Sequence, residues 1–138
     1  MANILVVYYS RTGHTKAMAE CIAQAADAVE GANATVRPVD EVTPDDLLDF
    51  DGIIMGSPVY YGTMAAPLKQ LIDESVKHHG KLDGKVGGAF SSSGVIGGGN
   101  ETTVLDILAT LLVHGMIVKG TAHGPHYGPT CQGAPDEN

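Results

Sequence analysis

The sequence lacks tryptophan, has only two cysteines, and carries half as many basic residues as acidic ones. Cys21 and Cys131 are too few for a disulfide framework and lack the spacing of a metal site, so we expect a reduced, cytoplasmic protein. Eight Lys and Arg against 16 Asp and Glu give a net charge of -8, which argues against binding nucleic acid through its phosphates. The first apolar run, residues 4–9, is too short for a membrane span or a signal peptide.

What the sequence does contain is an excess of glycine and enough apolar residues for a core. Its 138 residues, 43% of them hydrophobic and 17% charged, predict a single globular domain over residues 1–138. Glycine accounts for 18 of them, against a usual share of about 7%. Some part of the chain therefore needs backbone without side chains.

Short apolar runs alternate with helical patterns along the chain. Expected strands cover residues 4–9, 34–39, 52–56, 86–90 and 116–118, and expected helices cover about 16–30, 43–48, 67–76 and 101–113. This alternation predicts an α/β domain with a doubly wound, five-stranded parallel sheet. Right-handed crossovers leave few topologies, one of which is the strand order 2-1-3-4-5.

Three unusual loops fall at one edge of the predicted sheet, where a doubly wound domain binds its ligand beyond the carboxyl ends of the strands. They are residues 10–15, 57–63 and 91–100. Because they converge only in this fold, the three together are a more specific signal than any one of them.

The first loop has the chemistry of a phosphate site. Ser10, Thr12 and Thr15 offer hydroxyls, and the backbone N–H groups that open the next helix favour an anion. The loop is not a Walker A motif, and no G-x-G-x-x-G occurs in the chain. A polar turn that only caps the helix is the alternative.

The second and third loops suit a planar heterocycle. Tyr60 and Tyr61 follow Pro58, and large rings in a surface loop are expected to cover something flat. The third loop is uncharged and rich in serine and glycine, so its backbone N–H groups could bind the edge of such a ring. The alternatives are a tyrosine that packs on its own helix and a flexible loop without ligand.

At these motifs the chain resembles the flavodoxin-like FMN proteins. It is most similar to the tryptophan-repressor-binding-protein branch, the type IV NAD(P)H:quinone oxidoreductases. The resemblance spans nearly the whole chain and is carried by Tyr8-Tyr9-Ser10 with Gly13-His14, Gly56-Ser57-Pro58 with Tyr61-Gly62-Thr63-Met64, Phe90-Ser91-Ser92 with Gly97-Gly98-Gly99, and His114-Gly115-Met116.

The resemblance implies FMN as cofactor and a set of residues that bind it. The implied phosphate site is Ser10, Arg11, Thr12, Gly13, His14 and Thr15; the implied ring site is Pro58, Val59, Tyr60, Tyr61 and Gly62; the implied pyrimidine-edge site is Ser92, Ser93, Gly94, Ile96, Gly97 and Gly98, with His114 near the flavin. We expect no metal and no nucleophilic residue, because no such motif occurs and the chemistry would belong to the cofactor.

Two modes of redox function stay open. One is an enzyme that passes hydride from NAD(P)H to a quinone-like acceptor, which the branch resemblance favours slightly. The other is an electron shuttle that docks with partner proteins, which the acidic surface favours. A non-redox module that uses the phosphate loop for a nucleotide or a phosphoprotein is a third hypothesis.

The chain departs from that branch in three places. The segment before the third expected strand, residues 40–50, is shorter than in that branch, and residues 76–84 lack the tryptophan expected at the quinone site. Both differences weigh against quinone specificity and a tetramer, while a homo-oligomer stays open. Residues 134–137 resemble the cap and first turn of a final helix that then stops, so we expect a truncated chain or a second subunit over that face. Outside these motifs, we expect solvated histidines at 78–79 and 123–126, a core Cys21 and a tail thiol at Cys131.

Overall fold

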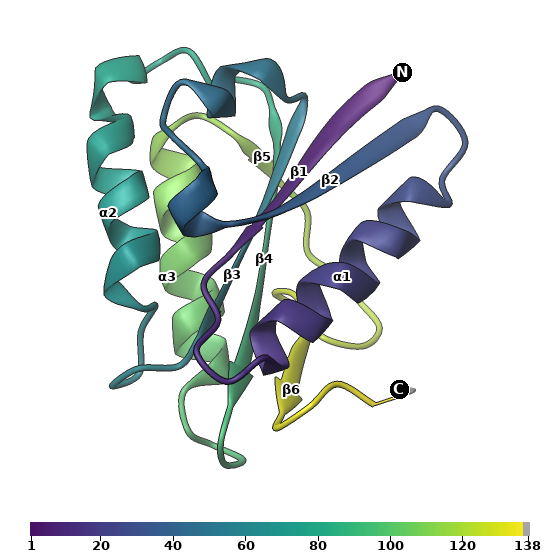
Figure 1. The fold of residues 1–138 in the computed structure, drawn as a ribbon, viewed down its shortest axis with the longest axis vertical. Coiled ribbons are helices and arrows are strands. Elements are labelled where there is room, and N and C mark those ends of the chain that lie inside the picture. Colours follow the sequence, from purple (N-terminus) through teal and green to yellow (C-terminus); the bar gives the residue numbers. More distant parts are fainter. Residues whose placement is uncertain (137–138) are drawn as a thin grey trace.

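The computed structural model describes residues 1–136 (Figure 1). Strands and helices alternate as expected up to residue 118, except that the helix expected at residues 43–48 is only a short 3-10 helix at Asp46–Asp49. The strands are β1 (Ala2–Tyr8), β2 (Ala32–Pro38), β3 (Gly52–Pro58), β4 (Val86–Ser93), β5 (Ile117–Val118) and β6 (Thr130–Gln132); the helices are α1 (His14–Asp27), α2 (Ala66–Glu74) and α3 (Asn100–Val113). Short 3-10 helices lie at Val39–Glu41, Asp46–Asp49 and Ser75–His78.

The sheet has the predicted topology. Its order is β2-β1-β3-β4-β5, and every pair is parallel. α1 covers one face, and α2 and α3 cover the other (Figure 1). The doubly wound α/β fold is therefore confirmed.

β6 is a strand that the sequence did not predict. It pairs with β4 at Ser91, Ser92 and Ser93, whereas β5 pairs with β4 at Val86 and Gly87. Two short strands thus share the place beside β4, and the second of them lies at the carboxyl edge where the ligand loops gather.

The apolar runs form strands because they are buried on both faces of the sheet. Leu5, Val6 and Val7 of β1 are 0% exposed, with Leu5 and Val7 in the core under α2 and α3 and Val6 in the core under α1. Gly56 has no room for a side chain, since a Cβ there would lie 2.0 Å from Cζ of the buried Phe90 ring. The missing side chain leaves this space to the Phe90 ring in the core under α1.

The predictions for both cysteines are wrong. Cys21 is exposed, because α1 turns Met18, Ala19 and Ala23 toward the sheet instead. The prediction failed because alanines occur on both faces of this helix, so the sequence did not show which face is buried. Cys131 is half-buried in β6, with its Sγ 3.1 Å from the Met18 sulfur, so it is not a tail thiol. Burial raises the pKa of the Cys131 thiol, and the Asp136 carboxylate raises it further.

The expected final helix does not begin within the described residues. Residues 133–136 are not helical, and Glu137 and Asn138 lie outside the part of the chain that the structure describes. On the α1 face, Val86 and Ile117 are 56% and 58% exposed. A further segment or a second subunit over this face stays a prediction. None of the helices within residues 1–136 is long and apolar enough to cross a membrane.

Candidate functional site

The first loop presents the N-terminus of α1 to the carboxyl edge of the sheet. Gly13 is the N-cap, in the left-handed conformation with φ 101°, and its N–H donates to the Ser10 hydroxyl at 3.1 Å. The first helical turn contains no acidic residue. The first backbone N–H groups of α1 thus have neither an intrahelical partner nor a capping side chain, as in a site for an anion.

A buried pair of hydroxyls joins the first loop to the third. Thr15 Oγ1 lies 2.8 Å from Ser92 Oγ, and the two residues are 2% and 5% exposed. Each hydroxyl has one hydrogen, and the bond between the two oxygens takes only one of these two hydrogens. The other O–H can therefore donate to a ligand. Polar groups this deep are normally satisfied, and a bound anion at the helix terminus would satisfy them.

The second loop ends in a tight turn over residues 60–63. Tyr60 and Thr63 exchange backbone hydrogen bonds of 2.9 and 3.2 Å, and Tyr61 and Gly62 between them have φ of 52° and 78°. A left-handed conformation costs a non-glycine residue about 1–2 kcal/mol. The Tyr60 ring packs edge-on against Tyr9, with centroids 6.1 Å apart, whereas Tyr61 is fully exposed.

The third loop is tied to its surroundings at its base. Ser92 O accepts a hydrogen bond from Val59 N at 2.9 Å, and Ser93 O accepts one from Gly133 N at 2.8 Å. Asn100, the first residue of α3, accepts from the Ser91 hydroxyl at 2.7 Å and donates to the Ser93 hydroxyl at 2.8 Å. The tip beyond Ser93 is exposed.

The three loops enclose one cavity of about 620 Å³, within the range of small-molecule sites. None of its lining residues is acidic. It is lined by Arg11, Thr12, His14, Thr15, Pro58, Val59, Tyr60, Ser92, Ser93, Gly94 and Gly133. All but Gly133 belong to the predicted site.

The remaining predicted loop residues lie beside this cavity rather than in its wall. Ser10 and Gly13 line a neighbouring cavity of about 460 Å³ on the other side of the first loop. Tyr61, Gly62, Ile96, Gly97 and Gly98 are in the second and third loops but outside the lining of both cavities. Sequence reasoning missed Gly133, because nothing in the residues around it marks the pairing of β6 with β4.

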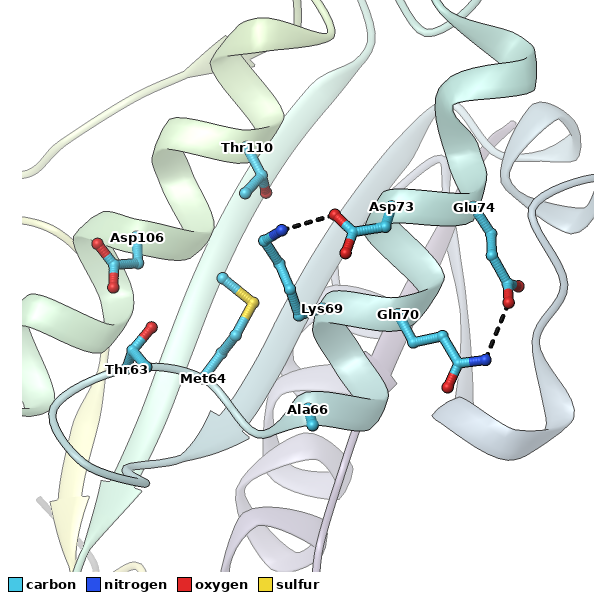
Figure 2. A pocket seen from close by; sticks show the side chains of 9 residues that line it. All are labelled: Thr63, Met64, Ala66, Lys69, Gln70, Asp73, Glu74, Asp106 and Thr110. Carbon is cyan, nitrogen blue, oxygen red and sulfur yellow. Dashed lines mark hydrogen bonds and ion pairs between the residues drawn. The ribbon is translucent and has the colours of Figure 1, made fainter.

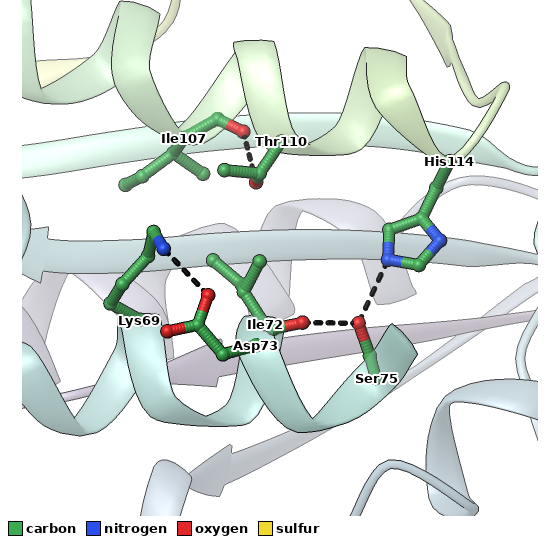
Figure 3. Close-up of polar contacts among 7 residues, drawn as sticks. All are labelled: Lys69, Ile72, Asp73, Ser75, Ile107, Thr110 and His114. Carbon is green, nitrogen blue, oxygen red and sulfur yellow. Dashed lines mark hydrogen bonds and ion pairs between the residues drawn. The ribbon is translucent and has the colours of Figure 1, made fainter. Parts of the chain in front are cut away.

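The structure places His114 away from the other predicted residues, so its assignment to this site is corrected. His114 follows α3 and lies at the edge where β5 begins, opposite the three loops, and its Nε2 is 2.8 Å from Ser75 Oγ (Figure 3). The Ser75 hydroxyl donates to Ile72 O at 2.6 Å, so the His114 Nε2–H must donate to Ser75. Burial lowers the pKa of His114, and the nearby His79 lowers it further.

A larger groove, of about 720 Å³, runs between α2 and α3 and contains none of the predicted residues (Figure 2). Along α2, Lys69 lies 2.6 Å from Asp73 and Gln70 lies 2.9 Å from Glu74, and Asp106 of α3 also lines the groove. Within residues 1–136, no group of three or more His, Cys, Asp or Glu side chains could hold a metal. His78 is not solvated as expected, because it lies 2.6 Å from Asp45 and is 11% exposed.

The parallel sheet, with its hydroxyl-bearing helix N-terminus and two further loops at the same edge, defines a ligand-binding domain of the doubly wound class. The flavodoxin domain family matches residues 5–121, and the chain belongs to this family. It is 39% identical to a flavodoxin of Aquifex aeolicus, over 98% of this chain and 77% of the relative. It is also 39% identical to an NAD(P)H dehydrogenase (quinone) of Sinorhizobium fredii, over 87% of this chain and 71% of the relative.

A solved structure agrees with this membership. A flavodoxin, WrbA-like protein from Agrobacterium tumefaciens superposes with a TM-score of 0.80 at 30% identity, over 96% of this chain and 83% of the other. Members of the flavodoxin family are FMN-binding flavoproteins. The observed site fits such a cofactor, because a phosphate could meet the N-terminus of α1 and the free O–H of the Thr15–Ser92 pair and the non-acidic cavity has room for rings.

Proposed function

We propose that this redox protein reduces quinone-like acceptors with electrons from NAD(P)H, using FMN held in the 620 Å³ cavity. The observation that carries the proposal is the absence of any acidic residue from the lining of that cavity. A wall that has no acidic residue and includes the cationic Arg11 does not repel a second anionic or planar molecule that approaches the flavin. The quinone dehydrogenase among the relatives supports the same reaction.

In this proposal each loop has one task. The first loop binds the phosphate with hydroxyl and backbone donors: Thr12 in the cavity wall, the N-terminus of α1, and Ser10, whose hydroxyl lies beside that terminus at the Gly13 N–H. Val59 and Tyr60 of the second loop pack against the ring, and backbone N–H groups of the third loop bind its polar edge. When bound, FMN supplies hydride acceptance and electron transfer, and the protein tunes both through these contacts.

An electron shuttle to partner proteins is the second candidate. It is favoured by the net charge of -8, which would steer a basic partner to the surface, and by the flavodoxin among the relatives. A cytoplasmic location and a homo-oligomer stay predictions under both candidates. A non-redox module has no observation in its favour.

Anaerobic titration of the FMN-loaded protein separates the two candidates. The reductase should lose its flavin absorbance in one two-electron step when NADPH or NADH is added, and p-benzoquinone should restore it. A shuttle should not react with either nicotinamide and should be reduced by dithionite in two separate one-electron steps. That second result would refute the proposed reaction.

The phosphate assignment has its own test. Ser10→Ala combined with Thr12→Ala should weaken FMN binding by about 10- to 100-fold for each charge-assisted hydrogen bond lost. Riboflavin, which lacks the phosphate, is the matched control ligand, and its affinity should not change. Equal losses for FMN and riboflavin would show that the loop does not bind the phosphate.

A further inference from the structure

The turn at residues 60–63 holds one residue, Tyr61, in a conformation that it does not favour. Tyr61 is a non-glycine residue at φ 52°, where its Cβ crowds the backbone. Its ring is fully exposed, so packing of that side chain does not compensate. Two backbone hydrogen bonds between Tyr60 and Thr63 close the turn. These two bonds offset the cost at Tyr61 only within the turn, so a contact from outside would add to its stability and fix its position.

That contact comes from the first turn of α3. Thr102 Oγ1 lies 2.6 Å from Gly62 O and 2.9 Å from Gly99 O. A helical threonine commonly donates to a carbonyl three or four residues earlier, which here is Gly99. The shorter of the two contacts is the one across the fold, so the hydroxyl of Thr102 ties the second loop to α3.

The turn also rests directly on the backbone that precedes α3. A Cβ at Gly99 would lie 2.9 Å from Gly62 Cα and 3.0 Å from Val59 Cγ1, so no side chain fits between the two loops. Gly99 has φ 117°, which favours glycine. Together with the bond from Val59 to Ser92 at the base, the contact at Thr102 fixes the second and third loops to each other at both ends.

We propose that Thr102 is a positioning residue, whose hydroxyl sets the gap between the two loops that flank the flavin ring. The proposal rests on the proposed function, because it assumes that FMN occupies the cavity between these loops. Thr102 itself does not line that cavity. It acts through Gly62, and therefore through the orientation of Tyr60 and Tyr61.

The test compares neighbouring threonines of the same helix. Thr102→Val keeps the β-branched shape and removes the hydroxyl, and Thr102→Ser keeps the hydroxyl. Thr103→Val is the matched control, because Thr103 is 0% exposed and its hydroxyl has no partner among the described residues. We would measure amide hydrogen exchange at residues 60–63 in the apo protein, then FMN affinity and the midpoint potential of bound FMN.

Thr102→Val should speed exchange in the turn by roughly tenfold, weaken FMN by roughly tenfold and move the midpoint potential, as expected for the loss of one hydrogen bond. Thr102→Ser should restore all three values, and Thr103→Val should leave them unchanged. The proposal is overturned if Thr102→Val behaves like Thr103→Val, or if exchange rises while FMN affinity and potential stay at the wild-type values.

The two proposals can fail separately. A wild-type protein that takes up no FMN would refute the proposed function and, with it, the flavin role of Thr102. The exchange measurement needs no cofactor, so it would still decide whether Thr102 holds the turn.

Discussion

Replacing Thr15 with valine removes one hydroxyl of the buried Thr15–Ser92 pair and keeps the shape of the side chain. The lost bond is 2.8 Å long, and the remaining Ser92 hydroxyl, in a residue 5% exposed, loses its protein partner. An unsatisfied buried polar group costs about 1–3 kcal/mol, so Thr15→Val should lower the free energy of unfolding of the apo protein by about that amount. Ser92→Ala should cost a similar amount for the same reason.

A double-mutant cycle isolates the pair. Once both hydroxyls are gone, neither is left unsatisfied, so the double variant should lose less than the sum of the two single losses, by about 1 kcal/mol. Urea denaturation of the four apo proteins measures this difference. Single losses that add to within about 0.3 kcal/mol would show that Thr15 and Ser92 do not interact, and the link between the first and third loops would be wrong.

The same variant probes the cofactor. If Thr15 also donates to the phosphate, Thr15→Val should weaken FMN by about tenfold or more, as expected for the loss of a bond to a charged group. Riboflavin affinity should be unaffected. An equal effect on both ligands would mean that Thr15 shapes the cavity without contacting the phosphate.

Three further predictions concern stability and reactivity. Gly56→Ala should destabilise the apo protein by about 1–3 kcal/mol or more, since the new Cβ would lie 2.0 Å from a buried ring. The same change at Gly88 should be tolerated, because a Cβ there would lie 3.6 Å from its nearest neighbour. Equal urea midpoints for the two variants would contradict this packing. Burial lowers the pKa of His114 in the folded state, so the protein should lose stability as the pH falls below about 6.5, and His114→Gln should flatten that dependence in urea unfolding at pH 7.5 and 5.5. The exposed Cys21 should react with a thiol reagent faster than the half-buried Cys131, whose pKa burial raises, and the reverse order would place the wrong thiol in the core.

The sheet was predictable because its signals are local. Runs such as residues 4–9 are apolar over their whole length, which marks strands buried on both faces, and the helices between them show their own periodicity. Handedness then restricts the order of the strands. β6 escaped prediction because Thr130, Cys131 and Gln132 have no such pattern, and only their pairing with β4 makes them a strand.

The three loops of the candidate site could be predicted from the sequence, but the contacts that hold these loops in place could not. Hydroxyls, glycines and paired tyrosines marked the three loops, since they are unusual in their own segments. Asn100, Thr102 and Gly133 act through bonds to residues 7 to 40 positions away, and no local pattern reports such bonds. His114 was assigned from the resemblance, and a shared motif does not fix which edge of the sheet a residue occupies.

β5 pairs with one end of β4 and β6 with the other, and this arrangement determines where the chain tolerates an insertion. Residues 119–129 connect the two short strands, and nearly all of them are exposed, with the tip near His123 and Gly124. Lengthening an exposed loop costs only about 0.6 kcal/mol for each doubling of its length. A tag or a small domain inserted at this tip should leave both strand pairings intact, whereas shortening the segment would pull β6 off β4 and open the wall of the cavity at Gly133.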